Sequence, residues 1–187
     1  MPNFTRKAIK ETFLRQLGER PLGQITVKDI VEECGINRNS FYYHFEDLPA
    51  LVEEILRERV DSLIQIHPTI SSIEQGFDVV VEMLMQNKRA IYHIYNSLSR
   101  DVFERYLMEI CLYTVTAYVD AALAGQPVAE TDRAVIIRYH KCVCFGSVID
   151  WLSGGMKEDI TAFFHRVCQL KKGWQEETAR GLLCGGR

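Results

Sequence analysis

The chain lacks the long apolar run that a membrane-spanning helix requires. Nowhere in its 187 residues do apolar residues approach the roughly 20 in a row that cross a bilayer. The first residues, Met-Pro-Asn-Phe-Thr, also lack the charged-then-apolar pattern of a secretory signal. We therefore expect a soluble, cytoplasmic protein without a membrane partner.

Metal-binding spacings are missing as well, although the chain has six cysteines. No Cys-x2-Cys or His-x3-His pair occurs, and Cys142 and Cys144 would point about 200° apart on a helix. We expect free thiols in a reducing compartment, no metal and no cofactor. The segment 139–144 offers His140 beside these thiols but no orienting group, so catalysis is not expected.

A strong excess of positive charge, typical of nucleic-acid binders, is absent too, because the net charge is −3. A modest local excess lies near the start of the chain, at Arg6, Lys7, Lys10, Arg15, Arg20 and Lys28. Prolines are few and spread out, and apolar residues recur at helical spacing with no isolated alternating run. These patterns predict an all-α fold.

Residues 26–45 carry the pattern of two short helices joined by a tight turn. Thr26 and Asp29 resemble a capping box, and Asn37 is a good N-cap for the second helix. Gly35 stands where a helix commonly ends in a left-handed residue. The apolar residues of the first helix share one face, at Val27, Ile30, Val31 and Cys34. The segment therefore predicts a helix-turn-helix.

The second of these helices presents hydrogen-bonding groups without a carboxylate. Phe41 and Phe45 share the face that would pack on the first helix. Outward-pointing phenol, amide, hydroxyl, imidazole and guanidinium groups bind phosphates and base edges, although a solvated helix face is the alternative. The predicted DNA-binding residues are Arg38, Asn39 and Ser40 for bases, Tyr42, Tyr43 and His44 for phosphates, and Thr26 and Lys28 on the first helix.

Residues 26–45, with the run Gly-Ile-Asn-Arg-Asn-Ser-Phe-Tyr-Tyr-His-Phe at 35–45, resemble the DNA-binding signature of the tetracycline-repressor (TetR) family of bacterial transcription regulators. The likeness extends over residues 5–56. It implies a three-helix DNA-binding domain at 1–47, whose first helix is 5–17, and a larger helical domain at 48–187 that dimerises and senses an effector. It also implies a homodimer on a double-stranded operator, with repression as the family default. Leu48 departs from the family, which usually has a phosphate-binding lysine there.

The second half of the chain predicts helices at 71–87, 90–98, 99–124, 130–153 and 159–174. The helix at 130–153 is apolar nearly all round, which predicts burial on one side by its own chain and on the other by a second subunit. The residues predicted at this dimer interface are Phe145, Val148, Ile149, Leu152, Phe163, Phe164 and Val167.

Amphipathic side chains on these helices predict an effector cavity. The predicted ligand-binding residues are Tyr92, Tyr95, Arg105, Tyr106, Tyr113 and His140. Two alternatives stay open at this point: the same groups satisfy hydrogen bonds between helices, or the input is a protein partner instead of a small molecule. The segment 151–158 is similar to a subgroup of the family in which a protein partner is thought to control the regulator. An architectural DNA-bound protein would need no cavity at all.

Overall fold

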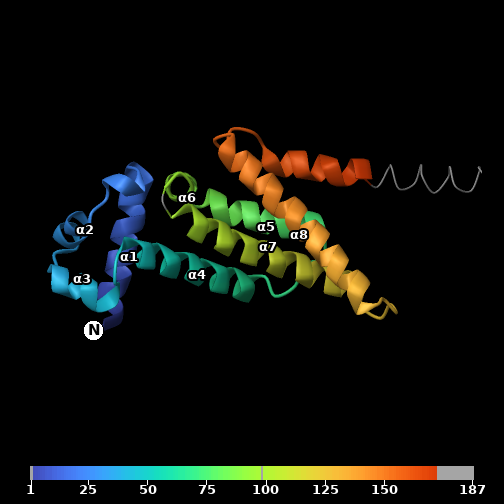
Figure 1. Cartoon of the computed structure of the whole chain (residues 1–187), viewed down its shortest axis with the longest axis horizontal. Helices are drawn as coiled ribbons and strands as arrows, with labels where there is room; N and C mark the ends of the chain where they lie inside the picture. The colour runs from blue at the N-terminus through green and yellow to red at the C-terminus, as the bar shows by residue number, and fades with distance from the viewer. Residues whose placement is uncertain (1, 98, 172–187) are drawn as a thin grey trace, which may run out of the picture.

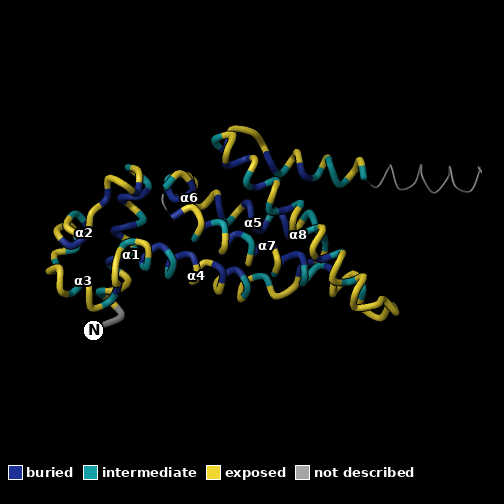
Figure 2. The backbone as a smooth tube through the Cα atoms, in the orientation of Figure 1, coloured by how far each residue is buried: buried dark blue, intermediate teal, exposed yellow. Residues whose placement is uncertain are grey.

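The computed structural model describes residues 2–97 and 99–171, and within these ranges all regular structure is helical. The helices form a smaller group at one end of an elongated molecule and a larger group beyond it (Figure 1). Burial follows the facing sides of the helices in both groups, so an apolar core continues from one into the other (Figure 2). The predicted all-α fold is confirmed.

The smaller group consists of α1 (Pro2–Glu19), the single turn η1 (Leu22–Gln24), α2 (Val27–Cys34) and α3 (Arg38–His44). The first helix is longer at both ends than the predicted 5–17. Its apolar side chains pack against α2 and α3. The fully buried residues are Ile9, Phe13 and Leu17 of α1, Ile30 of α2 and Phe41 of α3. The polar side chain of Gln16 is also buried, because its amide donates a hydrogen bond to Glu33 of α2.

Local chemistry sets the ends of α2 and α3 as predicted. The backbone N–H of Asp29 bonds the Thr26 hydroxyl, while the Asp29 carboxylate accepts the backbone N–H of Thr26 at 2.8 Å. Gly35 ends α2 with φ at 65°, a left-handed conformation that costs most residues about 1 kcal/mol or more. Asn37 then caps α3 through the N–H of Ser40, at 2.8 Å.

The larger group begins with α4 (Leu48–Ile66), which leads away from the smaller group and runs beside α7 (Figure 1). It continues through α5 (Ile73–Met85), α6 (Lys88–Tyr95), α7 (Arg100–Ala122) and α8 (Glu130–Ser153). A last helical segment at 160–171 follows a turn after α8. α6 packs on α1, so the two groups meet there as well as through α4.

Three helix ends differ from the sequence-based expectation. At α5 the helix begins at Ile73 and not at residue 71, because Ser72 is the capping residue and its hydroxyl accepts the N–H of Gln75. The helix expected at 90–98 begins at Lys88 and already ends at Tyr95. Ser99 holds the N-cap position of α7 but makes no side-chain cap. Residue 98 and residues 172–174, at the expected ends of two helices, lie outside the described ranges.

The segment 160–171 packs on its own chain. The ring of Phe164 stacks on that of Phe77 in α5, with centroids 3.8 Å apart, and His165 Nε2 lies 2.9 Å from a carboxylate oxygen of Asp78. Phe164 is therefore a core residue, as are Val148 and Leu152, whose side chains have no accessible surface within the single chain. These three side chains are almost fully enclosed by their own chain, so we expect a second subunit to contact their exposed neighbours instead.

Among residues 2–97 and 99–171, no helix combines the length and the apolar character that crossing a bilayer would need.

Candidate DNA-binding surface and effector cavity

The face of α3 that points away from α1 carries the residues expected at DNA bases. Arg38 and Asn39 are exposed, while Phe41 behind them is fully buried and fixes the rotation of the helix. Ser40 is half-buried and donates its hydroxyl to Asn37 Oδ1 at 3.1 Å, so its oxygen remains available as an acceptor. Arg38 has no ion pair with any residue that the structure describes, which leaves its guanidinium free for a base or phosphate.

The aromatic residues of α3 divide by exposure. Tyr43 and Tyr42 expose 78% and 55% of their surface. These fractions are high for tyrosine, a residue that is usually partly buried. His44 is half-buried, and its ring lies edge-on to Tyr43 with centroids 5.0 Å apart. Two phenolic hydroxyls on one exposed edge provide hydrogen-bond donors of the kind that phosphates accept.

The two residues predicted on α2 have different freedom. The Thr26 hydroxyl donates to Asp29 and accepts an N–H in the capping box, so it is committed inside the chain. These bonds to Thr26 also hold the pKa of the Asp29 carboxyl below its ordinary value. Lys28, by contrast, is exposed and lies 3.6 Å from Glu32 on the same helix, a solvent-screened pair that DNA could replace.

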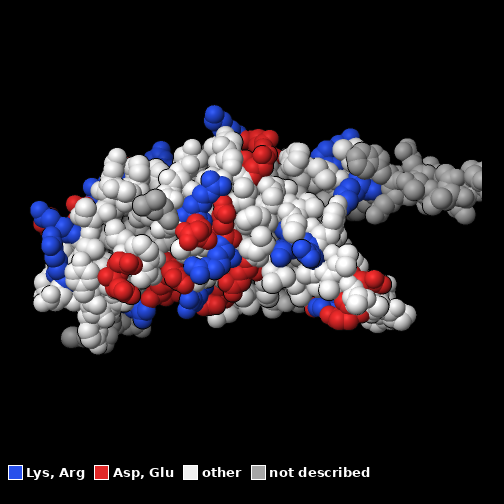
Figure 3. Space-filling model, in the orientation of Figure 1, with Lys and Arg blue, Asp and Glu red and all other residues white. Residues whose placement is uncertain are grey.

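Most of the basic side chains of α1 are engaged within the protein. Arg6 and Lys10 pair with Glu54 of α4, and Lys10 also reaches Glu58. Arg15 pairs with Glu33 of α2. Figure 3 shows the outcome: acidic and basic atoms alternate over the middle of the molecule, while basic atoms line the outer edge at α2 and α3. The local basic excess of the sequence therefore serves mainly to join helices.

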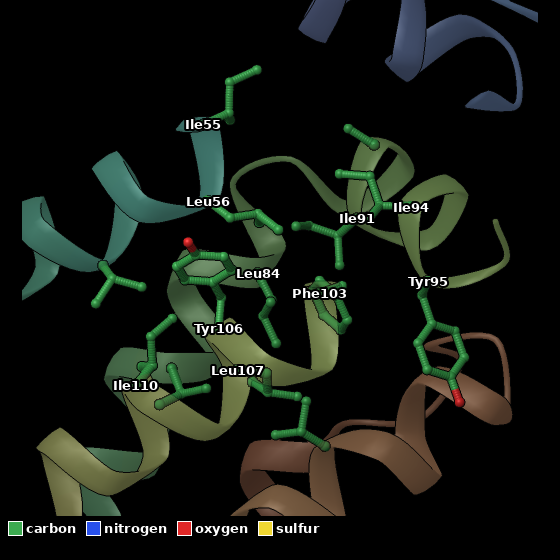
Figure 4. Packing of buried hydrophobic residues seen from close by; sticks show 14 of the residues in the cluster. Ile55, Leu56, Leu84, Ile91, Ile94, Tyr95, Phe103, Tyr106, Leu107 and Ile110 are labelled. Atoms are coloured by element: carbon green, nitrogen blue, oxygen red, sulfur yellow. The ribbon is translucent and has the colours of Figure 1, made fainter. Parts of the chain in front are cut away.

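Of the six residues predicted to bind an effector, Tyr106 lines an internal cavity. This cavity has a volume of about 30 Å³ and lies between α1, α4, α5, α6 and α7. Tyr95 is buried but points away from it and bonds Ser153 at 2.7 Å (Figure 4). Tyr113 donates to the carbonyl oxygen of His67 at 2.9 Å.

The other three predicted residues are also separate from the cavity. Tyr92 and Arg105 are exposed, and His140 lies on α8, where burial lowers its pKa. The side chains that do line the cavity, and that sequence reasoning missed, are Leu14, Ile55, Leu56, Arg59, Met83, Asn87, Ala90, Ile91, Ile94, Phe103, Leu107 and Ile110. Most of these side chains are apolar, and apolar residues at helical spacing follow the same pattern whether they fill a core or line a cavity.

Two of the thiols, those of Cys111 and Cys144, are buried in the core. Burial raises the pKa of Cys144 to about 12 and that of Cys111 further, so neither is a thiolate near neutral pH. Cys142 is exposed on another face of α8. In the part of the chain that the structure describes, no three His, Cys, Asp or Glu side chains are grouped so that they could hold a metal ion.

Known proteins share this arrangement. The family profile "Bacterial regulatory proteins, tetR family" matches residues 11–55, and the profile "Transcriptional regulator C-terminal region" matches residues 71–173. Among solved structures, the dihydroxyacetone kinase operon activator DhaS superimposes with a TM-score of 0.72 over 89% of this chain and 93% of that one, at 17% identity. At that identity the likeness shows the fold alone.

Curated relatives match about half of the chain. The transcriptional regulator TtgR of Pseudomonas putida is 29% identical over 106 residues, and the transcriptional repressor KstR2 of Mycolicibacterium smegmatis is 27% identical over 93. These alignments cover 57% and 49% of this chain but only 48% and 45% of the relatives, so the chain spans about half their length. One family profile covers more than half of the chain and a second covers its helix-turn-helix; the chain belongs to the TetR family of DNA-binding transcription regulators.

Proposed function

We propose that this regulator binds a specific operator as a homodimer and that a signal received by the larger helical group changes its affinity for DNA. The observation that carries the proposal is the exposed face of α3, where Arg38 and two tyrosines stand free while Phe41 is locked into the core. A helix of this kind enters the major groove with its first residues at the base edges. Repression is the sign of regulation we propose.

Within this proposal, the first turn of α3 gives sequence preference and its later part gives register. Arg38 and Asn39 have the donor geometry that matches guanine and adenine edges. Tyr42, Tyr43 and His44 reach phosphates, together with Lys28 and the N-terminus of α2, which Thr26 caps. Ser40 completes the base-facing set.

The second subunit is proposed on the exposed side of α8 and of the segment 160–171. Phe163 exposes 52% of its surface, and Phe145, Ile149 and Val167 are half-buried. Two further apolar residues of α8 belong to this side, Val135 and Tyr139, exposed by 66% and 52%. An apolar face of this extent favours burial against a copy of itself, because a symmetric dimer uses the same patch twice.

A signal acts on such a dimer by favouring the conformation in which the two α3 helices no longer fit successive major grooves. The internal cavity is well placed for this, because Leu14 of α1 lines it together with residues of α4 to α7. A molecule that enlarges the cavity would displace α1 relative to α4. A protein partner is the second candidate for the signal, and the small volume of the cavity, about 30 Å³, favours it.

The DNA-reading proposal is tested by comparing two variants on many duplexes. An operator is selected from a random-sequence duplex library, and binding isotherms are recorded on it and on its single-base variants at fixed salt. Arg38→Ala should lose roughly 1–3 kcal/mol and relax preference at one base pair of each half-site. Tyr43→Phe should weaken all duplexes alike, because a phosphate contact carries no sequence information.

Matched controls come from outside both α3 and the proposed dimer face. Arg105→Ala on α7 and Tyr92→Phe on α6 change the same residue types at exposed positions and should leave every isotherm unchanged. Equal losses on all duplexes for Arg38→Ala would remove that side chain from the groove. Full affinity in the Arg38→Ala, Tyr43→Phe double variant would remove DNA binding from α3.

A further inference from the structure

Two hollows lie next to each other between α4 and α5. The internal cavity is lined almost entirely by apolar side chains, and Figure 4 shows the core packing of four of them, Leu56, Ile91, Phe103 and Tyr106. The second hollow is an open groove of about 290 Å³ along the outer side of the same two helices, lined among others by Ser62, Ile66, Glu82 and Gln86.

The side chains of Arg59 and Met83 form the partition between the two hollows, because they are the residues that line both. Arg59 is exposed and Met83 is half-buried. Both side chains are long and unbranched, and methionine in particular changes rotamer at little cost. If they swing aside, the cavity and the groove join into one pocket open to solvent. Its volume then reaches the lower end of the roughly 300–1,000 Å³ that small-molecule sites occupy.

The chemistry at this partition favours an anion. The guanidinium of Arg59 has no ion pair or hydrogen bond with any residue in 2–97 or 99–171. Asn87 lines the cavity as well, and although it is the N-cap of α6, its side chain makes no cap hydrogen bond. The first turn of α6 therefore adds uncapped N–H groups and the positive end of a helix dipole beside that amide.

We propose that the effector of this regulator is a small apolar carboxylic acid. Its carboxylate pairs with Arg59 and Asn87, and its hydrocarbon part displaces Met83 and enters the apolar cavity toward Leu107 and Ile110. The two polar groups match a carboxylate because a guanidinium and an amide both donate to its oxygens. Glu82 lines the outer groove but not the cavity, so its negative charge repels a carboxylate only at the rim. An amine, in contrast, would form an ion pair with Glu82.

This inference rests on the proposed effector function of the larger helical group, and it also explains how binding would reach DNA. Leu14 of α1 is one of the residues that line the cavity. A hydrocarbon chain that fills the cavity presses on this side chain and moves α1, which carries the packing of α2 and α3.

The test uses three compounds of equal chain length that differ in charge: octanoate, 1-octanol and octylamine. Each is titrated calorimetrically into the full chain without DNA. Octanoate should bind at least tenfold more tightly than either of the others. Arg59→Gln should weaken octanoate roughly 10- to 100-fold, as expected for the loss of a charge-assisted pair, and should leave octanol unchanged. Asn87→Ala should weaken octanoate less, about threefold to tenfold.

Two variants control for charge and one for location. Arg138→Gln removes the same charge from α8, and Glu82→Gln removes the acid at the rim; neither should weaken octanoate. Ala90→Val adds two methyl groups to a buried residue that lines the cavity, so it takes up space that the hydrocarbon chain needs and should weaken octanoate binding. Thermal unfolding of each variant verifies that it is folded before the titration.

The outcomes separate the inference from the DNA-binding function. Octylamine binding more tightly than octanoate, with loss in Glu82→Gln, would overturn the inference, as would octanoate binding that Arg59→Gln does not change. Duplex binding by a protein that binds none of the three compounds overturns the inference and leaves the DNA-binding function intact. Octanoate binding that depends on Arg59, in a protein that binds no duplex, supports the inference and contradicts the proposed control of DNA.

Discussion

The Nδ1 atom of His93 lies 2.6 Å from the carbonyl oxygen of Leu17, so α6 is hydrogen-bonded to the last turns of α1. A carbonyl oxygen only accepts, and the proton must therefore reside on Nδ1. Tyr95, two residues farther along the same short helix, bonds Ser153 at the end of α8. α6 is thus tied to the DNA-binding helices on one side and to the C-terminal helices on the other.

Replacing His93 with leucine should lower the free energy of unfolding by about 1 kcal/mol, since the Leu17 carbonyl loses its side-chain partner. Denaturant titration measures the change. His140→Leu is the matched control, because His140 on α8 makes no hydrogen bond with the described residues, and it should stay within about 0.5 kcal/mol. Equal effects of the two substitutions would mean that the His93 contact does not join the helices.

Salt dependence should distinguish the lysine that faces solvent on α2 from the one that joins α1 to α4. Lys28→Gln should reduce the slope of log affinity against log salt by about one for each phosphate contact that is lost. Lys10→Gln should leave that slope unchanged and lower thermal stability, because Lys10 pairs with Glu54 and Glu58. Binding isotherms at several salt concentrations give the slopes. If Lys28→Gln leaves the slope unchanged, Lys28 does not contact a phosphate.

Gly146 gives a direct test of the proposed dimer. It is exposed on α8, and a Cβ added there would meet no atom within 4 Å in the single chain. Gly146→Glu should therefore leave the fold intact, with a helix-propensity gain of about 1 kcal/mol, while placing a charge in the apolar interface. Sedimentation velocity should show a shift toward monomer.

The control for Gly146→Glu is Val148→Ala, two residues away and fully buried. It should cost about 2 kcal/mol of stability and leave the protein's assembly unchanged at a temperature where it remains folded. A dimer that tolerates Gly146→Glu would exclude this side of α8 from the interface.

The loss of folding stability at acidic pH should depend on Glu54. Burial raises its pKa, but hydrogen bonds and charges from Arg6 and Lys10 outweigh that effect, so its pKa lies below the ordinary value near 4.5. A depressed pKa means that Glu54 stabilises the fold above the unfolded-state pKa and that this contribution is lost as pH falls through the folded-state pKa. Glu54→Gln should cost about 1–2 kcal/mol at pH 7 and much less near pH 3. Denaturant midpoints for both proteins across this range test it, and a pH-independent difference would contradict it.

Much of the helix-turn-helix could be predicted because short-range chemistry determines it. A hydroxyl and a carboxylate three residues apart form the cap at Thr26, and a residue without a Cβ ends α2 at Gly35. The burial of Phe41 and Phe45 follows from one helical face. Each of these features needs only the identity of residues within a few positions.

Prediction failed where partners come from distant segments. Gln16 is polar and its burial has no local signal, because its hydrogen-bond partner Glu33 is 17 residues away. The residues predicted to bind an effector were selected because they are polar. The hydroxyls of Tyr95 and Tyr113, however, form hydrogen bonds with Ser153 and with the backbone carbonyl of His67. Only the three-dimensional packing shows which helix faces surround a hollow, because a gap in the core leaves no trace in hydrophobic spacing.

The pairing of Arg6 and Lys10 with Glu54 has a consequence for how the protein moves on the chromosome. Cations that are neutralised inside the chain add little to the attraction between the protein and random DNA, so encounters with non-operator sequence should be brief. Such a protein searches more by repeated dissociation and return than by long travel along one duplex. The fraction of molecules stored on unrelated DNA stays small, and more of them remain free to respond when a signal arrives.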